Sequence, residues 1–234
     1  MRAEASITAR PGALHWSEQP PLTVRRTGSD RCHLVASAGG PLGGDELALS
    51  LQVQERPLTF ATTAATVVQP GPGPARFRVR AELRDACLNW HAGHTVICAD
   101  ADYRADFAIA LTGASRLCLR ESLSLGRHGE PGGVARTRIR ITVDGAPLLD
   151  QQTVLDGADP ALCGPAGTAG MRFLSTAVLV GHGDLAIPPA TERFAALPLE
   201  GPGMQILALG ETGRAAEQAI DNALTCVFTK TDPP

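Results

Sequence analysis

The segment CLNWHAGHTVIC contains four side chains of the kinds that bind soft metal ions. They follow the spacing C-x3-H-x2-H-x3-C and are Cys87, His91, His94 and Cys98. Two imidazoles and two thiolates would suit zinc or nickel. The spacing matches no common zinc-finger pattern, however, and His-Ala-Gly-His is typical of a turn that holds both imidazoles in solvent. We therefore favour a surface loop between two strands, and keep a weak, transient metal site as the alternative.

A carboxylate at Asp45 could take part in chemistry inside the fold. Asp45 follows the glycines of SAGGPLGGD and lies on the same side of an expected strand as Leu47 and Leu49, which favours an inward side chain. A buried carboxylate requires a partner, a water molecule or a metal. The alternative, which the sequence supports equally, is an Asp that caps the turn by accepting hydrogen bonds from backbone N–H groups.

Three further aspartates share one side of another expected strand: Asp100, Asp102 and Asp106. We interpret them as a solvated strand face. Paired carboxylates could also serve a glycosidase, since β-helices host enzymes that cleave polysaccharides. Aromatic residues that could stack on sugar rings make up only 4% of the chain, so this enzyme class is the minor alternative.

Arginines alternate with apolar residues in two segments, which places them on the outer faces of strands. The two sets are Arg76, Arg78 and Arg80, and Arg136, Arg138 and Arg140. A solvated, positively charged face is the simplest interpretation, and a protein-docking face is the functional one because arginine is favoured at interfaces. Nucleic-acid binding is less favoured, because no series of stacking aromatic residues accompanies these arginines.

The elements that position these side chains form a repeat. Apolar residues alternate with a period of two over 47–53, 77–83, 107–111 and 139–143. Each of these strands is followed by a short turn and a second apolar segment. The first leucines after the turns lie 30, 29 and 31 residues apart, at Leu58, Leu88, Leu117 and Leu148. A strand–turn–strand unit of about 30 residues thus recurs, and each unit is too small to bury its own apolar face.

Stacking of these units predicts an all-β fold, either a helicoidal, β-solenoid-like stack or a layered sandwich. We expect one domain over 1–234, with a repeat core over about 45–156 and a capping region over about 157–234. Residues 1–30 are expected to add one or two edge strands. The glycines of GGPLGGD precede a strand, whereas a phosphate-binding loop precedes a helix, so we interpret them as a tight turn.

The capping region contains two expected strands and one expected helix. The strands cover 172–181 and 204–210, and the segment 157–170 reads as a connecting loop. The alanine-rich segment 211–228 has apolar residues on one helical face, which predicts a short C-terminal helix. Packing against the β stack is the common fate of such a helix.

The bulk composition excludes several classes of protein. The net charge of −3 and the pI near 6.1 argue against a general affinity for nucleic acid or for anionic membranes, and no run approaches ~18 apolar residues. The N-terminal residues show no apolar core of a secretion signal. Six cysteines are scattered without a CxxC pair: Cys32, Cys87, Cys98, Cys118, Cys163 and Cys226. We expect buried free thiols in a cytoplasmic protein.

Four motifs occur in order within residues 22–156: GGPLGGDELALSLQV, FATTAATVVQPG, LNW and LGRHGE. As a set they resemble the UreD (UreH) family of urease accessory proteins. Beyond about residue 165 the sequence matches the family pattern poorly, and the chain looks short for the family. The family usually continues Leu-x-Trp with Leu-Pro and an acid, whereas this chain has LNWHAGH.

The resemblance implies a non-catalytic, helicoidal all-β scaffold that holds no tightly bound cofactor. It implies binding to UreF, through UreF to the nickel-carrying GTPase UreG, and to apo-urease, with Ni²⁺ passing transiently through an internal tunnel. On this resemblance Asp45 and Glu130 are expected on the metal path, and Thr62 and Thr63 in the tunnel wall or in packing. His91 and His94 are candidates to replace the missing acid.

Two other functions remain open at this point. One is a carbohydrate-active β-helix enzyme, and the other is a generic β scaffold that binds proteins and has no metal role. Genes for urease subunits and a P-loop GTPase beside this one would favour the maturation role.

Overall fold

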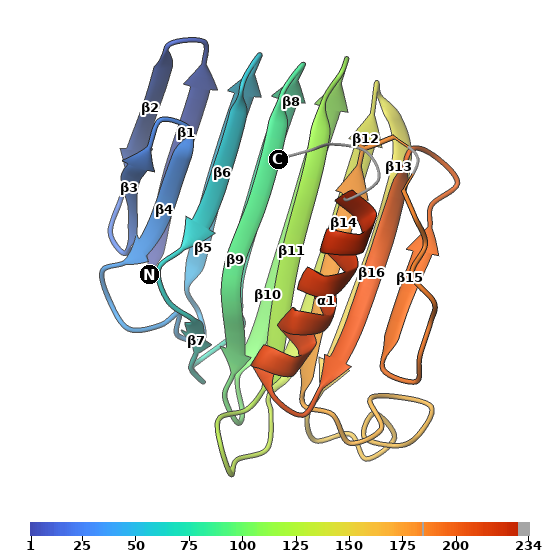
Figure 1. The fold of residues 1–234 in the computed structure, drawn as a ribbon. Coiled ribbons are helices and arrows are strands. Elements are labelled where there is room, and N and C mark those ends of the chain that lie inside the picture. The colour runs from blue at the N-terminus through green and yellow to red at the C-terminus, as the bar shows by residue number, and fades with distance from the viewer. Residues whose placement is uncertain (184, 229–234) are drawn as a thin grey trace.

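The computed structural model describes residues 1–183 and 185–228, which form two stacked β-sheets and one helix (Figure 1). Sheet A has the strand order β13 (Ala146–Asp156), β12 (Val134–Val143), β10 (Asp102–Thr112), β8 (Ala75–Arg84), β5 (Glu46–Gln54), β1 (Arg2–Arg10) and β2 (Ala13–Glu18). Sheet B has the order β15 (Phe194–Pro198), β16 (Gly203–Gly210), β14 (Phe173–Val180), β11 (Arg116–Leu125), β9 (Cys87–Ile97), β6 (Pro57–Thr62), β4 (Arg31–Ala36) and β3 (Leu22–Gly28), and β7 (Thr66–Val68) pairs with β9.

The expected repeat of strand–turn–strand units is confirmed. In three units the first strand lies in sheet A and the second in sheet B, namely β5–β6, β8–β9 and β10–β11. Successive first strands pair in parallel, as do successive second strands. The alternating apolar side chains of both sheets therefore meet in one continuous core between the layers.

The fourth unit differs from the expectation. Its second strand, β13, does not cross to sheet B but returns antiparallel beside β12. Asp144 and Gly145 both have positive φ, at 47° and 82°, as a two-residue hairpin turn requires. The turn after β8 has one such residue, Asp85 with φ 47°, and there the chain passes to the opposite sheet.

The prediction of one or two edge strands in residues 1–30 is confirmed, because β2 ends sheet A and β3 ends sheet B. The sequence did not predict that β1 is an interior strand. This strand lies between β2 and β5 and pairs in parallel with β5. Ala3, Ala5, Ile7 and Ala9 point into the core. Small alanines carry a weak hydrophobic signal, so the sequence pattern did not distinguish this interior strand from an edge.

The glycines of GGPLGGD allow two stacked loops to touch backbone to backbone. A Cβ at Gly43 would lie 2.5 Å from the amide nitrogen of Gly71, and Gly43 N–H donates to Gln69 O at 3.0 Å. The interpretation as a turn before a strand is confirmed. These glycines serve close approach between neighbouring coils.

The predicted C-terminal helix is confirmed as α1 (Gly213–Phe228). Thr212 caps it, because its hydroxyl accepts the Ala215 N–H at 3.2 Å. Figure 1 shows α1 lying on the outer face of sheet B, where Ile220, Ala223 and Leu224 are buried in a second apolar cluster. Within the described part of the chain, no helix has the length and apolar character needed to cross a membrane.

Candidate functional site

A partly enclosed cavity lies between the two sheets. Both sheets contribute to its wall: Leu47, Phe77, Tyr103 and Phe107 from sheet A, and Leu34, Phe60, Trp90 and Glu121 from sheet B. The volume that the centre of a water molecule can occupy in this cavity is about 80 Å³. The cavity therefore has room for several water molecules. Ala38 and Gly39 line it and are exposed, so the cavity reaches the surface at the loop before β5.

Asp45 lies at this loop, buried, and lines the cavity. Its carboxylate accepts a hydrogen bond from Leu42 N–H at 2.9 Å and one from the Met1 ammonium at 2.6 Å. Both interpretations of Asp45 therefore hold, because the side chain points inward and also caps the turn. Burial acts to raise the pKa of Asp45, but these hydrogen bonds and the ammonium charge outweigh it and leave the pKa below its ordinary value.

Glu121 is the second carboxylate of the cavity, and it was not among the residues predicted from the sequence. It lies on β11 beside a bulge, where the pairing with β9 shifts between Arg120 and Ser122. Its side chain is hydrogen-bonded to Thr137 of β12, in the opposite sheet. Burial raises the pKa of Glu121 to about 7, and the hydrogen bond with Thr137 offsets only part of this effect.

A signal for Glu121 was present in the sequence. Leu117, Leu119, Leu123 and Leu125 are buried on one side of β11, and Glu121 occupies the middle position of that series. A carboxylate at an apolar position of an alternating strand indicates a buried acid.

Aromatic rings form much of the remaining cavity wall. The rings of Phe60 and Trp90 stack with centroids 4.5 Å apart, and Phe107 meets Trp90 edge-on at 5.7 Å. Tyr103 of sheet A is hydrogen-bonded to Thr95 of sheet B, and burial raises the pKa of its hydroxyl above the ordinary value. The two carboxylates thus face a wall that is largely apolar and offers few competing ligands.

Thr62 lines the same cavity. Its hydroxyl accepts a hydrogen bond from Gly93 N–H at 2.8 Å and donates to Ala64 O at 3.1 Å. Thr63 is exposed and only its backbone N–H bonds to Leu34 O, at 3.2 Å. Thr62 is therefore also a packing residue, whereas Thr63 does not line the cavity.

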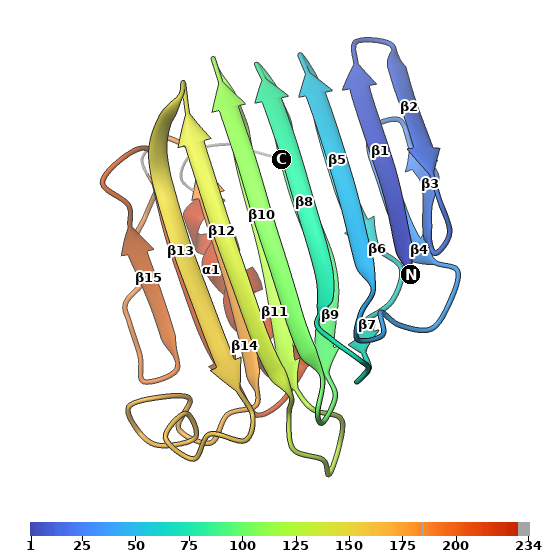
Figure 2. The same cartoon turned by 180° about the vertical axis from the view of Figure 1, so that it is seen from behind.

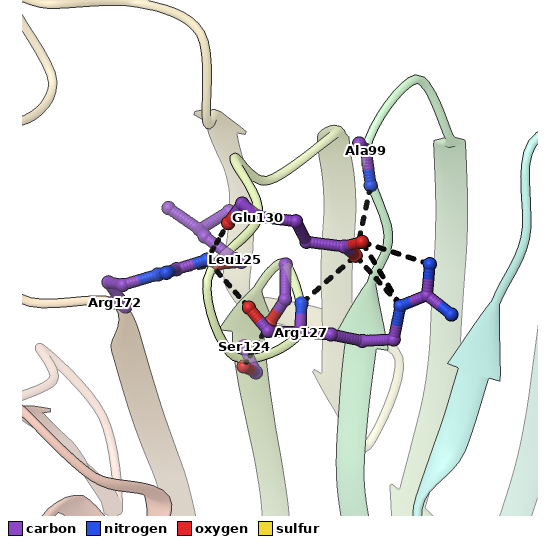
Figure 3. Close-up of polar contacts among 7 residues, drawn as sticks. Ala99, Ser124, Leu125, Arg127, Glu130 and Arg172 are labelled. Carbon is purple, nitrogen blue, oxygen red and sulfur yellow. Dashed lines mark hydrogen bonds and ion pairs between the residues drawn. The ribbon is translucent and has the colours of Figure 1, made fainter.

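Glu130 lies elsewhere, in the loop that joins β11 to β12 (Figure 3). Its carboxylate accepts hydrogen bonds from Arg127 Nε at 3.1 Å, from Arg127 Nη2 at 2.9 Å and from Ala99 N–H at 3.3 Å. These bonds, those from the Arg127 side chain above all, lower the pKa of Glu130 to about 2. Glu130 lines a shallow surface pocket near Cys163, and the structure does not bring it to the cavity of Asp45.

The predicted turn at His-Ala-Gly-His is wrong, because β9 runs without interruption from Cys87 to Ile97. A β-bulge replaces the turn: Ala92 and Gly93 lie together opposite Glu121 between two paired positions. Among the described side chains, those of residues 1–183 and 185–225, no group of three or more His, Cys, Asp or Glu residues is arranged to hold a metal ion.

The two histidines have different surroundings. His91 is exposed but lies within reach of the charges of Asp221 and Glu217 of α1, whereas His94 is partly covered by α1. Nδ1 of His94 is 2.9 Å from the carboxylate of Glu217, and its ring lies edge-on to Phe173 with centroids 6.0 Å apart. Its Nε2 faces the start of α1, where a Cβ on Gly213 would overlap it.

The cysteines of the described side chains are free thiols, as expected. Cys32, Cys98 and Cys118 are buried and Cys87 is half-buried. Cys163 is exposed, so the expectation of burial is wrong for this residue, which sits in the turns that follow β13. The side chain of Cys226 lies outside the described part.

All six predicted arginines lie on the outer face of sheet A, but they fall into two sets. Each arginine of β12 forms an ion pair: Arg136 with Asp102 at 2.9 Å, Arg138 with Asp150 at 2.7 Å and Arg140 with Asp106 at 2.6 Å. Asp102 and Asp106 are therefore a solvated, ion-paired face of β10, as the first interpretation held, whereas Asp100 lies in the turn before β10. Arg76, Arg78 and Arg80 of β8 have no ion pair or hydrogen bond with any other described side chain.

Comparison with known proteins gives one consistent result. The sequence model of the family described as "UreD urease accessory protein" matches residues 4–230. "Urease accessory protein UreD" of Frankia alni is 36% identical, with 90% of this chain and 74% of the relative covered. "Urease accessory protein UreD 3" of Streptomyces griseus is 33% identical, with 96% of both chains covered.

These matches correct one expectation: the similarity does not stop near residue 165 but extends through β14, β16 and α1. The match covers 96% of the Streptomyces griseus relative and a smaller share of the Frankia alni relative. The protein from Parafrankia, named "Urease accessory protein UreD", is 35% identical over 86% of this chain and 78% of its own length. The two-sheet stack with its single C-terminal helix thus belongs to a chain that is a member of the UreD family of urease accessory proteins.

Proposed function

We propose that this protein is a non-catalytic, cytoplasmic factor that delivers Ni²⁺ into apo-urease together with UreF and the GTPase UreG. Membership of the UreD family supports a role in urease maturation. The observation that carries the nickel role is the cavity between the sheets, which two carboxylates, Asp45 and Glu121, line within a largely apolar wall.

The chemistry of these two groups suits a route for Ni²⁺. Carboxylate oxygens bind nickel, but less tightly than a set of imidazoles and thiolates would. A delivery protein has to release its cargo, so a few oxygen ligands serve it better than a tight site. Because the pKa of Glu121 is about 7, protons compete with the metal for this carboxylate near neutral pH, which further favours release.

The cavity also separates the candidates of the sequence analysis. Asp45 and Thr62 line it, and Glu121 joins them. Glu130, His91 and His94 do not line it. That these three residues bind nickel outside the cavity remains a prediction. The position of Glu130 is already explained by its hydrogen bonds with Arg127 and Ala99.

The proposal is tested by activating purified apo-urease with this chain, UreF, UreG, GTP and limiting Ni²⁺. Asp45→Asn and Glu121→Gln should each reduce the nickel bound per urease active site, whereas co-purification with UreF should persist. Asp159→Asn and Glu192→Gln are the matched controls, because both residues are exposed and Asp159 also caps a turn, at 2.8 Å from Ala161 N–H. Full nickel content in urease activated by both cavity variants would reject the route through the cavity.

A further inference from the structure

The outer face of sheet A is uncovered. Figure 2 looks onto this face, and no helix or loop of the described residues crosses it. The outer face of sheet B differs, because α1 packs there against β14 and β16 (Figure 1). Sheet A therefore presents a broad, nearly flat surface of strands, and the side chains on it decide what it can bind.

The unpaired arginines of β8 lie in the middle of this face. β8 has β10 on one side and β5 on the other. Arg78 lies opposite Asp106 of β10, which would be its natural partner. The carboxylate of Asp106 is bound by Arg140 instead, at 2.6 Å. On its other side Arg78 faces Ala48 of β5, which offers no acceptor, so its charge is left without a partner.

Arg80 is unpaired for a related reason. Its neighbours across the strands are Ser50 of β5 and Ala108 of β10, and neither carries a charge. The hollow that Ser50 lines with Ser6 and Ser17 also contains Glu4 and Glu18, so it is not where an acidic side chain would enter. Across the strands only the small side chains of Ser50 and Ala108 flank the exposed guanidinium group of Arg80, and the nearest acid on its own strand face is Glu82, two residues along.

The three arginines of β8 carry positive charge, whereas the chain as a whole has a net charge of −3. A guanidinium group is weakly hydrated and binds carboxylates through two parallel hydrogen bonds, so its desolvation costs less than that of an ammonium group. A second copy of this chain is a poor partner, because a two-fold contact through this face would set the β8 arginines of one copy against those of the other. Charge complementarity calls for a different, acidic protein.

We propose that Arg78 and Arg80, with Arg76 beside them, form the centre of a docking surface for an acidic face of apo-urease. This inference rests on the proposed function, which requires apo-urease as a partner. The proposal assigns different roles to the two sets of arginines that were predicted as an interface. The β8 set makes the contact, whereas the β12 set is already neutralised by Asp102, Asp106 and Asp150 and supports the sheet.

The test measures binding of the full-length chain to nickel-free urease of the same organism. Replacing Arg78→Gln and Arg80→Gln together should weaken binding about tenfold at 50 mM NaCl, and the difference from the wild type should shrink as salt rises, because exposed charges are screened. Arg31→Gln with Arg214→Gln is the matched control. Both residues are exposed and off sheet A, and the control pair removes the same charge.

Each outcome has a defined meaning. If the wild-type chain fails to bind apo-urease, the proposed function itself fails. If the wild type binds and both pairs weaken binding equally, or neither does, the docking surface is rejected while the function stands. Heparin and vesicles of one-third phosphatidylserine serve as competing polyanions. Loss of heparin or vesicle binding in the Arg78→Gln/Arg80→Gln variant, with intact urease binding, would assign the face to a polyanion and overturn the proposal.

Discussion

Glu121 on β11 is hydrogen-bonded to Thr137 on β12, so a polar contact joins sheet B to sheet A through the apolar core. Leu119 and Leu123 flank Glu121 on the same side of its strand and are buried. Apolar residues at all three positions would pack well without any hydrogen bond. The acid therefore lowers the stability that this strand could reach.

Stability should reveal Glu121 through its dependence on pH. Its ordinary pKa is 4.5, and in the fold the pKa is about 7. Between these values the folded chain holds the proton that the unfolded chain has released, so the free energy of unfolding falls as pH rises. Relative to Glu121→Gln, the wild type should lose on the order of 2 kcal/mol between pH 4.5 and 7.5.

Urea unfolding of both proteins across this pH range measures the difference. The Thr137→Val variant, which removes the partner hydroxyl, should move the steep part of the wild-type curve to higher pH. Parallel curves for the wild type and Glu121→Gln would show that Glu121 ionises as freely in the fold as in the unfolded chain.

The two glycine loops provide a second test, of how closely the coils stack. A Cβ on Gly71 would lie 2.8 Å from Cα of Gly43, whereas a Cβ on Gly73 would meet nothing within 4 Å. Gly71→Ala should destabilise the fold by about 2–4 kcal/mol because backbone atoms cannot yield as side chains do. Gly73→Ala should change stability by less than about 0.5 kcal/mol. Thermal unfolding compares the two, and equal effects would contradict the close contact.

Much of the fold followed from local sequence patterns. Side chains of a strand alternate between its two sides, so burial of one side alone produces the alternation at Leu47, Leu49 and Leu51. The left-handed turn at Asp144–Gly145 is likewise a local property. The sequence therefore predicted this turn. It did not predict that β13 stays in sheet A, because that depends on which sheet has room for the next strand.

The site was predicted less completely, because it depends on contacts between distant segments. Asp45 was identified from its side of the strand, but the resemblance alone suggested Glu130, whose carboxylate binds Arg127 instead of lining the cavity. Arg78 and Arg138 looked equivalent in sequence. Only the register of β8, β10 and β12 shows that one is free and the other is bound to Asp150.

The loop that carries Glu130 should lose order when its carboxylate is removed. In Glu130→Gln the amide accepts fewer hydrogen bonds from Arg127 and Ala99, so amide hydrogen exchange at these two residues should accelerate. The stabilisation is complete above the ordinary pKa of 4.5 and is lost as pH falls toward the folded value of about 2. Exchange in the two proteins should therefore converge near pH 2.

Glu192→Gln is the control for the loop, because Glu192 is exposed and far from it in sequence. Arg172 donates to Leu125 O at 2.9 Å and to Arg127 O at 3.2 Å and keeps its contacts in Glu130→Gln. Faster exchange should thus be confined to the segment around Arg127. Unchanged exchange at Ala99 and Arg127 would remove the structural role assigned to Glu130.

His94 provides the last test, because it links β9 to α1. His94→Ala removes the contact with Glu217 and leaves a gap beside Phe173, so α1 should detach more readily. A loss of about 1 kcal/mol corresponds to roughly fivefold faster amide exchange in the helix. The ion pair of Arg120 with Asp221, at 2.8 Å, keeps α1 docked in most molecules.

His15→Ala is the matched control, since His15 is exposed on β2 of sheet A, and it should leave exchange in α1 unchanged. The His91→Ala/His94→Ala double variant also tests the prediction from sequence that both histidines bind nickel. If its Ni²⁺ affinity equals that of the wild type while α1 exchanges faster, His94 serves to hold the helix and both histidines leave the nickel route. If the affinity falls and α1 stays protected, the histidines are ligands and the helix is held by Arg120 and the apolar cluster around Ile220.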